Sequence, residues 1–285
     1  MKIRLCAFAD EASEKFSEQL EALNRHRIPF IELRGLDGKN VSELGEKEAI
    51  GYKKMLDDAG VRVWSVGSPL GKVGLREDFG KHLQLCERVF SLAGIFGTDK
   101  IRVFSFYGAN PEKDENEVVE KLSAMCELAK KYNVTLYHEN EKEIFGDTPE
   151  RVLKILRRVG GIKSVFDPAN YVQCGVDAGK ALEMLGAKSD YFHIKDAIAG
   201  TGEVVPAGEG DGHLSELVGG LDRDTVFTLE PHLIVFGGYT AIDKTALKGK
   251  YTFSSGQEAF AAAVAALAVL LEKNSFREEN GAWIK

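Results

Sequence analysis

The sequence lacks the features of a secreted, disulfide-stabilised or membrane-spanning protein. It has four cysteines in 285 residues, without CxxC spacing, so we expect reduced thiols and neither a disulfide framework nor a zinc knuckle. The longest apolar run, residues 259–271, is too short to cross a bilayer. The first residues show no cationic segment followed by an apolar one, which is the pattern of a secretion signal. These absences predict a cytoplasmic protein without a membrane partner.

The sequence also has fewer basic than acidic residues. Lys and Arg together number 37 against 44 Asp and Glu, and the net charge is −7. Nucleic acid is held mainly by clustered Lys and Arg that neutralise phosphates. We therefore expect no nucleic acid partner, although a local basic patch stays compatible with this composition.

What the chain does contain is a regular alternation of short apolar strands and amphipathic helices, which indicates a parallel sheet with helical crossovers. The predicted strands are 3–10, 30–35, 61–66, 100–106, 136–140, 165–167, 191–196 and 226–230. The predicted helices are 14–27, 49–58, 79–96, 118–132, 149–159, 177–185, 214–221 and 258–272.

Eight such repeats close naturally into an α/β fold of the (β/α)₈ TIM-barrel type, which commonly fills this length as a single domain. We predict one barrel domain over residues 1–285. An open doubly wound sheet is the competing fold, but the first strand is not followed by the glycine-rich phosphate turn typical of it. The long segment 234–256 after the last strand is predicted to be an active-site lid, and the tail 275–285 to be loosely packed.

Four consecutive predicted strands end on a side chain that binds metals or transfers protons. These side chains are Glu139, Asp167, His193 and Glu230. In a barrel, the carboxyl ends of all strands meet on one face, where active sites gather. A single Glu or Asp at a strand end is often only a helix cap or a solvated residue, so the repetition carries the prediction of one shared site.

Three carboxylates and one imidazole form an oxygen-rich donor set that suits one divalent metal ion, Mn²⁺, Mg²⁺ or Co²⁺, with Zn²⁺ as a further option. Such an ion can polarise the carbonyl of a sugar or hydroxy-ketone and stabilise an enediolate. Glu139 and Glu230, on separate strands, are placed to remove a proton from one carbon and to return it elsewhere.

Other polar residues near these strand ends are weaker candidates for substrate contact. Lys195 shares a face with His193, and His232 shares a face with Glu230, because strand side chains alternate. A surface role competes for Lys195. Arg34 at the end of the second strand either reaches a substrate oxygen or, as we favour, is solvated. The histidines on predicted helices, His82 among them, are expected to be solvated.

The sequence around these residues resembles the xylose isomerase-like TIM-barrel superfamily of sugar and sugar-phosphate isomerases and epimerases. The matching stretches are His-Glu-Asn at 138–140, Phe-Asp-Pro-Ala-Asn at 166–170, His-Ile-Lys-Asp at 193–196, Gly-Glu-Gly-Asp at 208–211 and Leu-Glu-Pro at 229–231, with Phe-Ile-Glu-Leu-Arg at 30–34 resembling the second strand. The resemblance covers nearly the whole chain and does not specify one substrate.

The resemblance implies one divalent metal held by Glu139, Asp167, His193 and Glu230, with the two glutamates also acting as the acid/base pair. Many members have a substrate-binding histidine three residues after the aspartate, and here that position is Asn170. The substrate is expected to be a small carbohydrate or polyol derivative, and the departure at Asn170 means that the resemblance does not carry over the usual substrates. Barrels of this kind often pair, so a homo-oligomer is open by analogy alone.

We therefore favour a metal-dependent sugar isomerase or epimerase, and three alternatives stay open. A lyase or dehydratase on the same scaffold also begins with proton removal beside a carbonyl. An apurinic-site endonuclease would need a trinuclear zinc site, for which six histidines, two of them on predicted helices, are few. A non-catalytic sugar-binding member would not need all four ligands.

Overall fold

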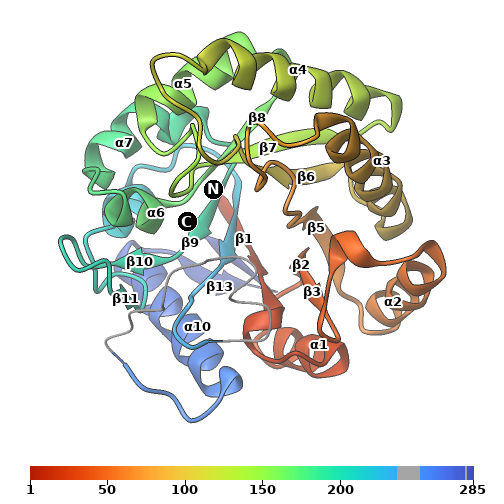
Figure 1. Cartoon of the computed structure of the whole chain (residues 1–285). Coiled ribbons are helices and arrows are strands. Elements are labelled where there is room, and N and C mark those ends of the chain that lie inside the picture. Colours follow the sequence, from red (N-terminus) through yellow and green to blue (C-terminus); the bar gives the residue numbers. More distant parts are fainter. Residues whose placement is uncertain (236–250, 280) are drawn as a thin grey trace.

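The computed structural model describes residues 1–235, 251–279 and 281–285. Eight parallel strands follow one another around a ring, and the last pairs with the first (Figure 1). These strands are β1 (Lys2–Ala7), β2 (Phe30–Leu33), β5 (Arg62–Val66), β6 (Lys100–Val103), β7 (Thr135–Glu139), β8 (Lys163–Phe166), β9 (Tyr191–Ile194) and β12 (Thr225–Leu229). The predicted (β/α)₈ barrel is confirmed, and the open doubly wound sheet is excluded.

Helices surround the ring of strands (Figure 1). The main ones are α1 (Phe16–Arg25), α2 (Glu46–Asp58), α3 (Phe79–Phe96), α4 (Glu115–Lys131), α5 (Pro149–Arg158), α7 (Ala178–Leu185), α8 (Leu214–Gly219) and α10 (Gly256–Lys273). Each lies within a few residues of its predicted bounds because the apolar spacing marks the face that packs on the barrel. Within the described part of the chain, no helix is long and apolar enough to span a bilayer.

The barrel interior has an apolar floor. It is formed by a cluster of strand side chains, namely Cys6, Phe30, Tyr137, Val165, Tyr191 and Val226, with Trp64 packed against them. Strand side chains alternate between the two faces, so the next inward position on each strand lies one layer higher. The polar residues of the site occupy these higher layers.

The C-terminal tail is part of the barrel wall, so the prediction that it is loosely packed is wrong. Strands β13 (Arg277–Glu279) and β14 (Ala282–Ile284) pair with each other, and β14 pairs antiparallel with β1. The two chain ends also exchange backbone hydrogen bonds, Met1 to Lys285 and back, at 2.9 and 3.1 Å. The buried side chains of Phe276 and Trp283 anchor the tail. The charged residues between them made the segment look exposed in the sequence.

Residues 236–250 of the predicted lid lie outside the described residues, so the lid stays a prediction. A second difference concerns His82 on α3, which is not solvated. It is buried, and its Nε2 accepts a hydrogen bond of 3.1 Å from the backbone N–H of Gly71. Helical spacing alone placed this histidine on a helix without revealing the loop that covers it.

Candidate metal centre

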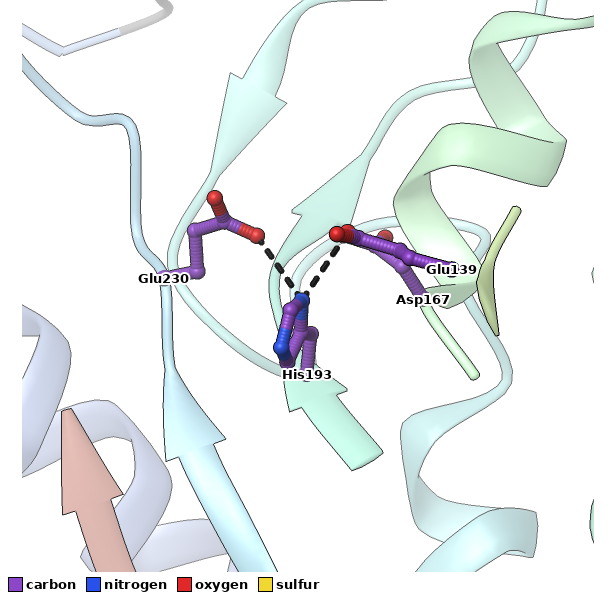
Figure 2. A group of neighbouring side chains, drawn as sticks. All are labelled: Glu139, Asp167, His193 and Glu230. Atoms are coloured by element: carbon purple, nitrogen blue, oxygen red, sulfur yellow. Dashed lines mark hydrogen bonds and ion pairs between the residues drawn. The ribbon is translucent and has the colours of Figure 1, made fainter. Parts of the chain in front are cut away.

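The four predicted ligands converge on one point at the carboxyl ends of consecutive strands. Their ligand atoms all lie within 4.8 Å of one another, and all four side chains are buried. Nδ1 of His193 is 2.9 Å from Oε1 of Glu139 and 3.1 Å from Oε2 of Glu230. Figure 2 shows that the two glutamates approach the imidazole from opposite sides, with Asp167 beside Glu139.

Local structure fixes the positions of Glu139 and Asp167. The side chain of Asn140 donates to the backbone O of Asp167 over 2.8 Å and accepts from its N–H over 2.9 Å, which ties the end of β7 to the end of β8. Oδ1 of Asp167 accepts from the N–H of Asn170 at the start of the short helix α6 (Pro168–Gln173), which the sequence did not predict. This helix cap turns the other oxygen, Oδ2, towards Lys195.

The centre contains more acidic than basic side chains. Among the described residues, its six buried acidic side chains are Asp10, Glu11, Glu32, Glu139, Asp167 and Glu230, and its buried Lys and Arg side chains are Arg34, Arg102 and Lys195. Burial, together with the neighbouring glutamates, raises the pKa of Asp167 against the lowering effect of Lys195. Like charges held together away from water repel one another, and a bound divalent cation would relieve that repulsion.

The donor set fits a divalent cation. Three buried carboxylate oxygens, Oε2 of Glu139, Oδ2 of Asp167 and Oε2 of Glu230, accept no hydrogen bond from any described residue, although cationic groups lie near them. Buried polar atoms are rarely left in this state unless an ion or water satisfies them. Oxygens with one imidazole nitrogen are ligands that Mn²⁺, Mg²⁺, Co²⁺ and Zn²⁺ accept.

A family model described as the xylose isomerase-like TIM barrel matches residues 20–232, about three quarters of the chain. The chain belongs to this family.

Named proteins similar to this family member have different activities. A 3-dehydroshikimate dehydratase of Bacillus anthracis is 24% identical over 206 residues, which cover 69% of this chain and 72% of that protein. The crystal structure of a D-psicose 3-epimerase, solved in the presence of D-fructose, has a TM-score of 0.70 at 17% identity and covers 94% of this chain and 98% of its own. That of the IOLI protein with a binding zinc atom has a TM-score of 0.73 at 17% identity, covering 96% and 99%. These two structures share the fold.

Lys195 and Arg34, for which a surface position was one of the two alternatives, both point into this xylose isomerase-like barrel. Lys195 is buried, and its Nζ lies 2.9 Å from Oδ2 of Asp167 and 3.7 Å from Oε2 of Glu230. Arg34, for which we favoured solvation, is 2% exposed. That prediction is wrong because several carboxylates, including Glu230, surround its guanidinium inside the barrel.

The other two predicted substrate contacts also lie at the centre. Nε2 of His232 is 3.4 Å from Oε1 of both Glu11 and Glu230. Nδ2 of Asn170 donates to the backbone O of Asn140 over 2.8 Å and lies 3.4 Å from Oε1 of Glu139. All the predicted site residues therefore gather in one place, and their contact with substrate stays a prediction.

Sequence reasoning missed four charged residues of the centre, Asp10, Glu11, Glu32 and Arg102. Nη1 of Arg102 lies 3.3 Å from Oε2 of Glu139. Glu32 has hydrogen bonds to His193, Tyr191 and Thr228. Strand alternation offered a signal for Glu32, because it shares the inward face of β2 with Arg34 and stands between apolar neighbours.

The glycine-rich loop at 208–212 is organised around Asp196 of strand β10 (Asp196–Ala197). The carboxylate of Asp196 accepts N–H bonds from Gly208, Gly210 and Gly212 at 2.9, 3.0 and 2.9 Å, and from its neighbour Ala197 at 2.9 Å. A side chain at position 210 would lie 2.5 Å from the backbone O of Ala197, so this close approach requires glycine. These amides bind the protein's own carboxylate and are therefore not free to hold a phosphate group.

Proposed function

We propose that this protein is a divalent-metal-dependent isomerase or epimerase. It moves a proton at a carbon next to a carbonyl in a small carbohydrate or polyol derivative. The observation that carries the proposal is the placement of Glu139 and Glu230 on opposite sides of the Nδ1 atom of His193, at 2.9 and 3.1 Å. Two carboxylates on opposite sides of a substrate suit removal of a proton from one face and its return to the other.

Glu139, Asp167, His193 and Glu230 would hold the ion. When bound, it would polarise the substrate carbonyl and stabilise negative charge on its oxygen. Although burial alone would raise the pKa of Glu230, Lys195, His193 and His232 together lower it well below its usual range. Glu230 thus carries the negative charge that a metal ligand needs, and we assign it and Glu139 to proton transfer on opposite sides of the substrate.

Lys195, His232 and Asn170 are the groups we assign to substrate oxygens, since each has a nitrogen beside a carboxylate of the centre. Nitrogen donors so placed can orient hydroxyl or carbonyl groups of a polyol. Arg34 receives a different role from the one considered on sequence alone. Because it is paired with Asp10, Glu11 and Glu230, we assign it to holding Glu230 in place.

A dehydratase is the second candidate, and the 24% identity to a 3-dehydroshikimate dehydratase over 206 residues supports it. Both reactions begin with removal of a proton beside a carbonyl. In a dehydratase, a hydroxyl group on the next carbon then leaves as water, and no proton returns to the first carbon.

Incubation in D₂O separates these reactions. We would load the protein with Mn²⁺ or Co²⁺, offer ketoses and 3-dehydroshikimate, and follow carbon-bound deuterium and products by NMR and mass spectrometry. Deuterium at an inverted or isomerised carbon supports the proposal, whereas loss of water without such exchange favours the dehydratase. Exchange with none of these substrates by the metal-loaded protein, or cleavage of abasic DNA, would contradict it.

Variants test the two glutamates in the same assay. Glu139→Gln and Glu230→Gln should each slow exchange by about 10²-fold or more, the usual effect of removing a general acid or base. Glu150→Gln, an exposed residue at the start of α5, is the control and should leave exchange unchanged. Unchanged activity in Glu139→Gln would favour a role in binding over catalysis.

A further inference from the structure

We propose that Glu32 is a positioning residue for His193. It fixes the tautomer of the imidazole and aims its Nδ1 lone pair at the metal centre. The proposal rests on the metal site proposed above and adds a fifth residue to it, one on the far side of His193 from the other ligands.

The two nitrogens of His193 lie beside different carboxylates. Nδ1 lies between Glu139 and Glu230. Nε2 lies 3.2 Å from Oε2 of Glu32, which reaches it from β2, elsewhere on the barrel wall. Within the described part of the chain, Glu32 is the hydrogen-bond partner of Nε2.

A neutral imidazole carries its proton on one nitrogen and a lone pair on the other. A carboxylate beside Nε2 accepts a hydrogen bond and therefore stabilises the tautomer with the proton on Nε2. Nδ1 also lies within hydrogen-bond distance of Glu139 and Glu230, and in the metal-loaded protein it would be the nitrogen left with the lone pair. Carboxylates commonly orient metal-binding histidines in this way, and they also make the imidazole a stronger donor.

Glu32 is itself held rigidly, as a positioning group must be. It is 1% exposed. Oε1 accepts from the hydroxyl of Tyr191 over 3.0 Å, and Oε2 accepts from the hydroxyl of Thr228 over 3.0 Å. Tyr191 lies two residues before His193 on β9, and Thr228 lies two before Glu230 on β12, so the strands that carry two metal ligands also orient Glu32.

The aromatic rings around the imidazole offer Nε2 no hydrogen-bond acceptor comparable to Glu32. The rings of Phe8 and Tyr191 lie 5.2 and 5.7 Å from that of His193, measured between centroids. Loss of the Glu32 carboxylate would therefore leave the Nε2 proton without an equivalent acceptor and remove the preference for one tautomer. Metal affinity would fall, while the four ligands themselves would remain.

The test is metal affinity, measured without any substrate. Dissociation constants for Co²⁺ are obtained by competition with a chromophoric chelator for wild type, Glu32→Gln and Glu32→Asp. We expect Glu32→Gln to weaken binding by about 10- to 100-fold, as is usual when such a supporting group is lost. Glu32→Asp keeps the charge but withdraws it from Nε2, so it should weaken binding too. Glu21→Gln, an exposed residue of α1, is the control and should bind as wild type does.

A second measurement needs no variant and so remains decisive if the substitutions prevent folding. In wild type loaded with Zn²⁺, ¹⁵N NMR of histidine should show the proton of His193 on Nε2 and the metal on Nδ1. The reverse assignment, or unchanged Co²⁺ affinity in both Glu32 variants, would overturn the role of Glu32 while leaving the proposed function intact. Absence of metal binding by wild type would overturn both.

Discussion

Nη1 of Arg34 donates to Oε1 of Glu230 over 2.8 Å, and both side chains are almost completely buried. The same guanidinium forms a two-bond pair with Asp10, at 2.8 and 2.9 Å, and reaches Glu11 at 3.1 Å. One cation thus links the segment after β1 to the ends of β2 and β12, at the point where the barrel closes. Breaking a buried pair leaves uncompensated charge, so Arg34 should support both stability and the position of Glu230.

Arg34→Met should lower the free energy of unfolding by about 3–5 kcal/mol, because carboxylates are left buried without their partner. Urea denaturation at pH 7 measures this. Arg27→Met is the matched control, since Arg27 is exposed and pairs with Glu278 at the surface at 3.4 Å. The control should change stability by less than about 1 kcal/mol. Equal effects in the two variants would show that the buried cluster is not held by Arg34.

Asp196→Asn should destabilise the loop at 208–212 by about 1–3 kcal/mol, because an amide cannot replace a carboxylate as acceptor for several backbone N–H groups. Hydrogen exchange at Gly208, Gly210 and Gly212 should become faster. Asp211→Asn provides the comparison, since Asp211 accepts a backbone N–H from outside the loop, that of Ala199, at 2.7 Å. If exchange of the three glycine amides is unchanged in Asp196→Asn, Asp196 does not organise the loop.

His82 should make stability depend on pH. Burial, with a smaller contribution from Lys121, lowers its pKa from the ordinary value of 6.5. The unfolded chain therefore takes up the proton more readily, and stability declines as the pH falls below about 6.5.

His82→Gln cannot gain this charge but keeps an acceptor for the N–H of Gly71. It should be less stable than wild type at pH 7.5, and the difference should narrow as the pH falls to 5. Urea denaturation across this range measures the difference. Parallel pH profiles for the two proteins would rule out titration of a buried His82.

The fold was predictable because it follows from the spacing of apolar residues and from the eightfold repetition of strand and helix. Apolar runs at strand spacing alternate with amphipathic helices, and no local conflict interrupts them. The C-terminal hairpin was not predictable from the sequence. Its strand β13 has the composition of an exposed charged segment, and the hairpin is ordered by pairing between distant ends of the chain. Helix α6 was missed because it is a single turn and a half, set by the cap at Asp167.

The four ligands were predictable for a similar reason, since each ends a recognisable strand and all strand ends share one face. The charges that support them were harder to find. Arg34 looks like a surface residue in sequence, and its burial depends on carboxylates from β12 and from the 3-10 helix η1 (Ala9–Glu11). Glu32 acts across the barrel on a residue 161 positions away. Periodicity gives the face of a side chain but not its partner on another strand.

The most direct test of the metal centre is elemental analysis of protein loaded with Mn²⁺, Co²⁺ or Zn²⁺ and freed of excess ion. Asp167→Asn is the decisive variant, because asparagine still caps α6 but is a poor metal ligand. Asp222→Asn, at an exposed aspartate, is the control. We expect about one ion per chain in wild type and control, and loss of the ion in Asp167→Asn. No bound metal in wild type, the same content in Asp167→Asn, or about three zinc ions per chain would contradict the four-ligand, single-ion centre.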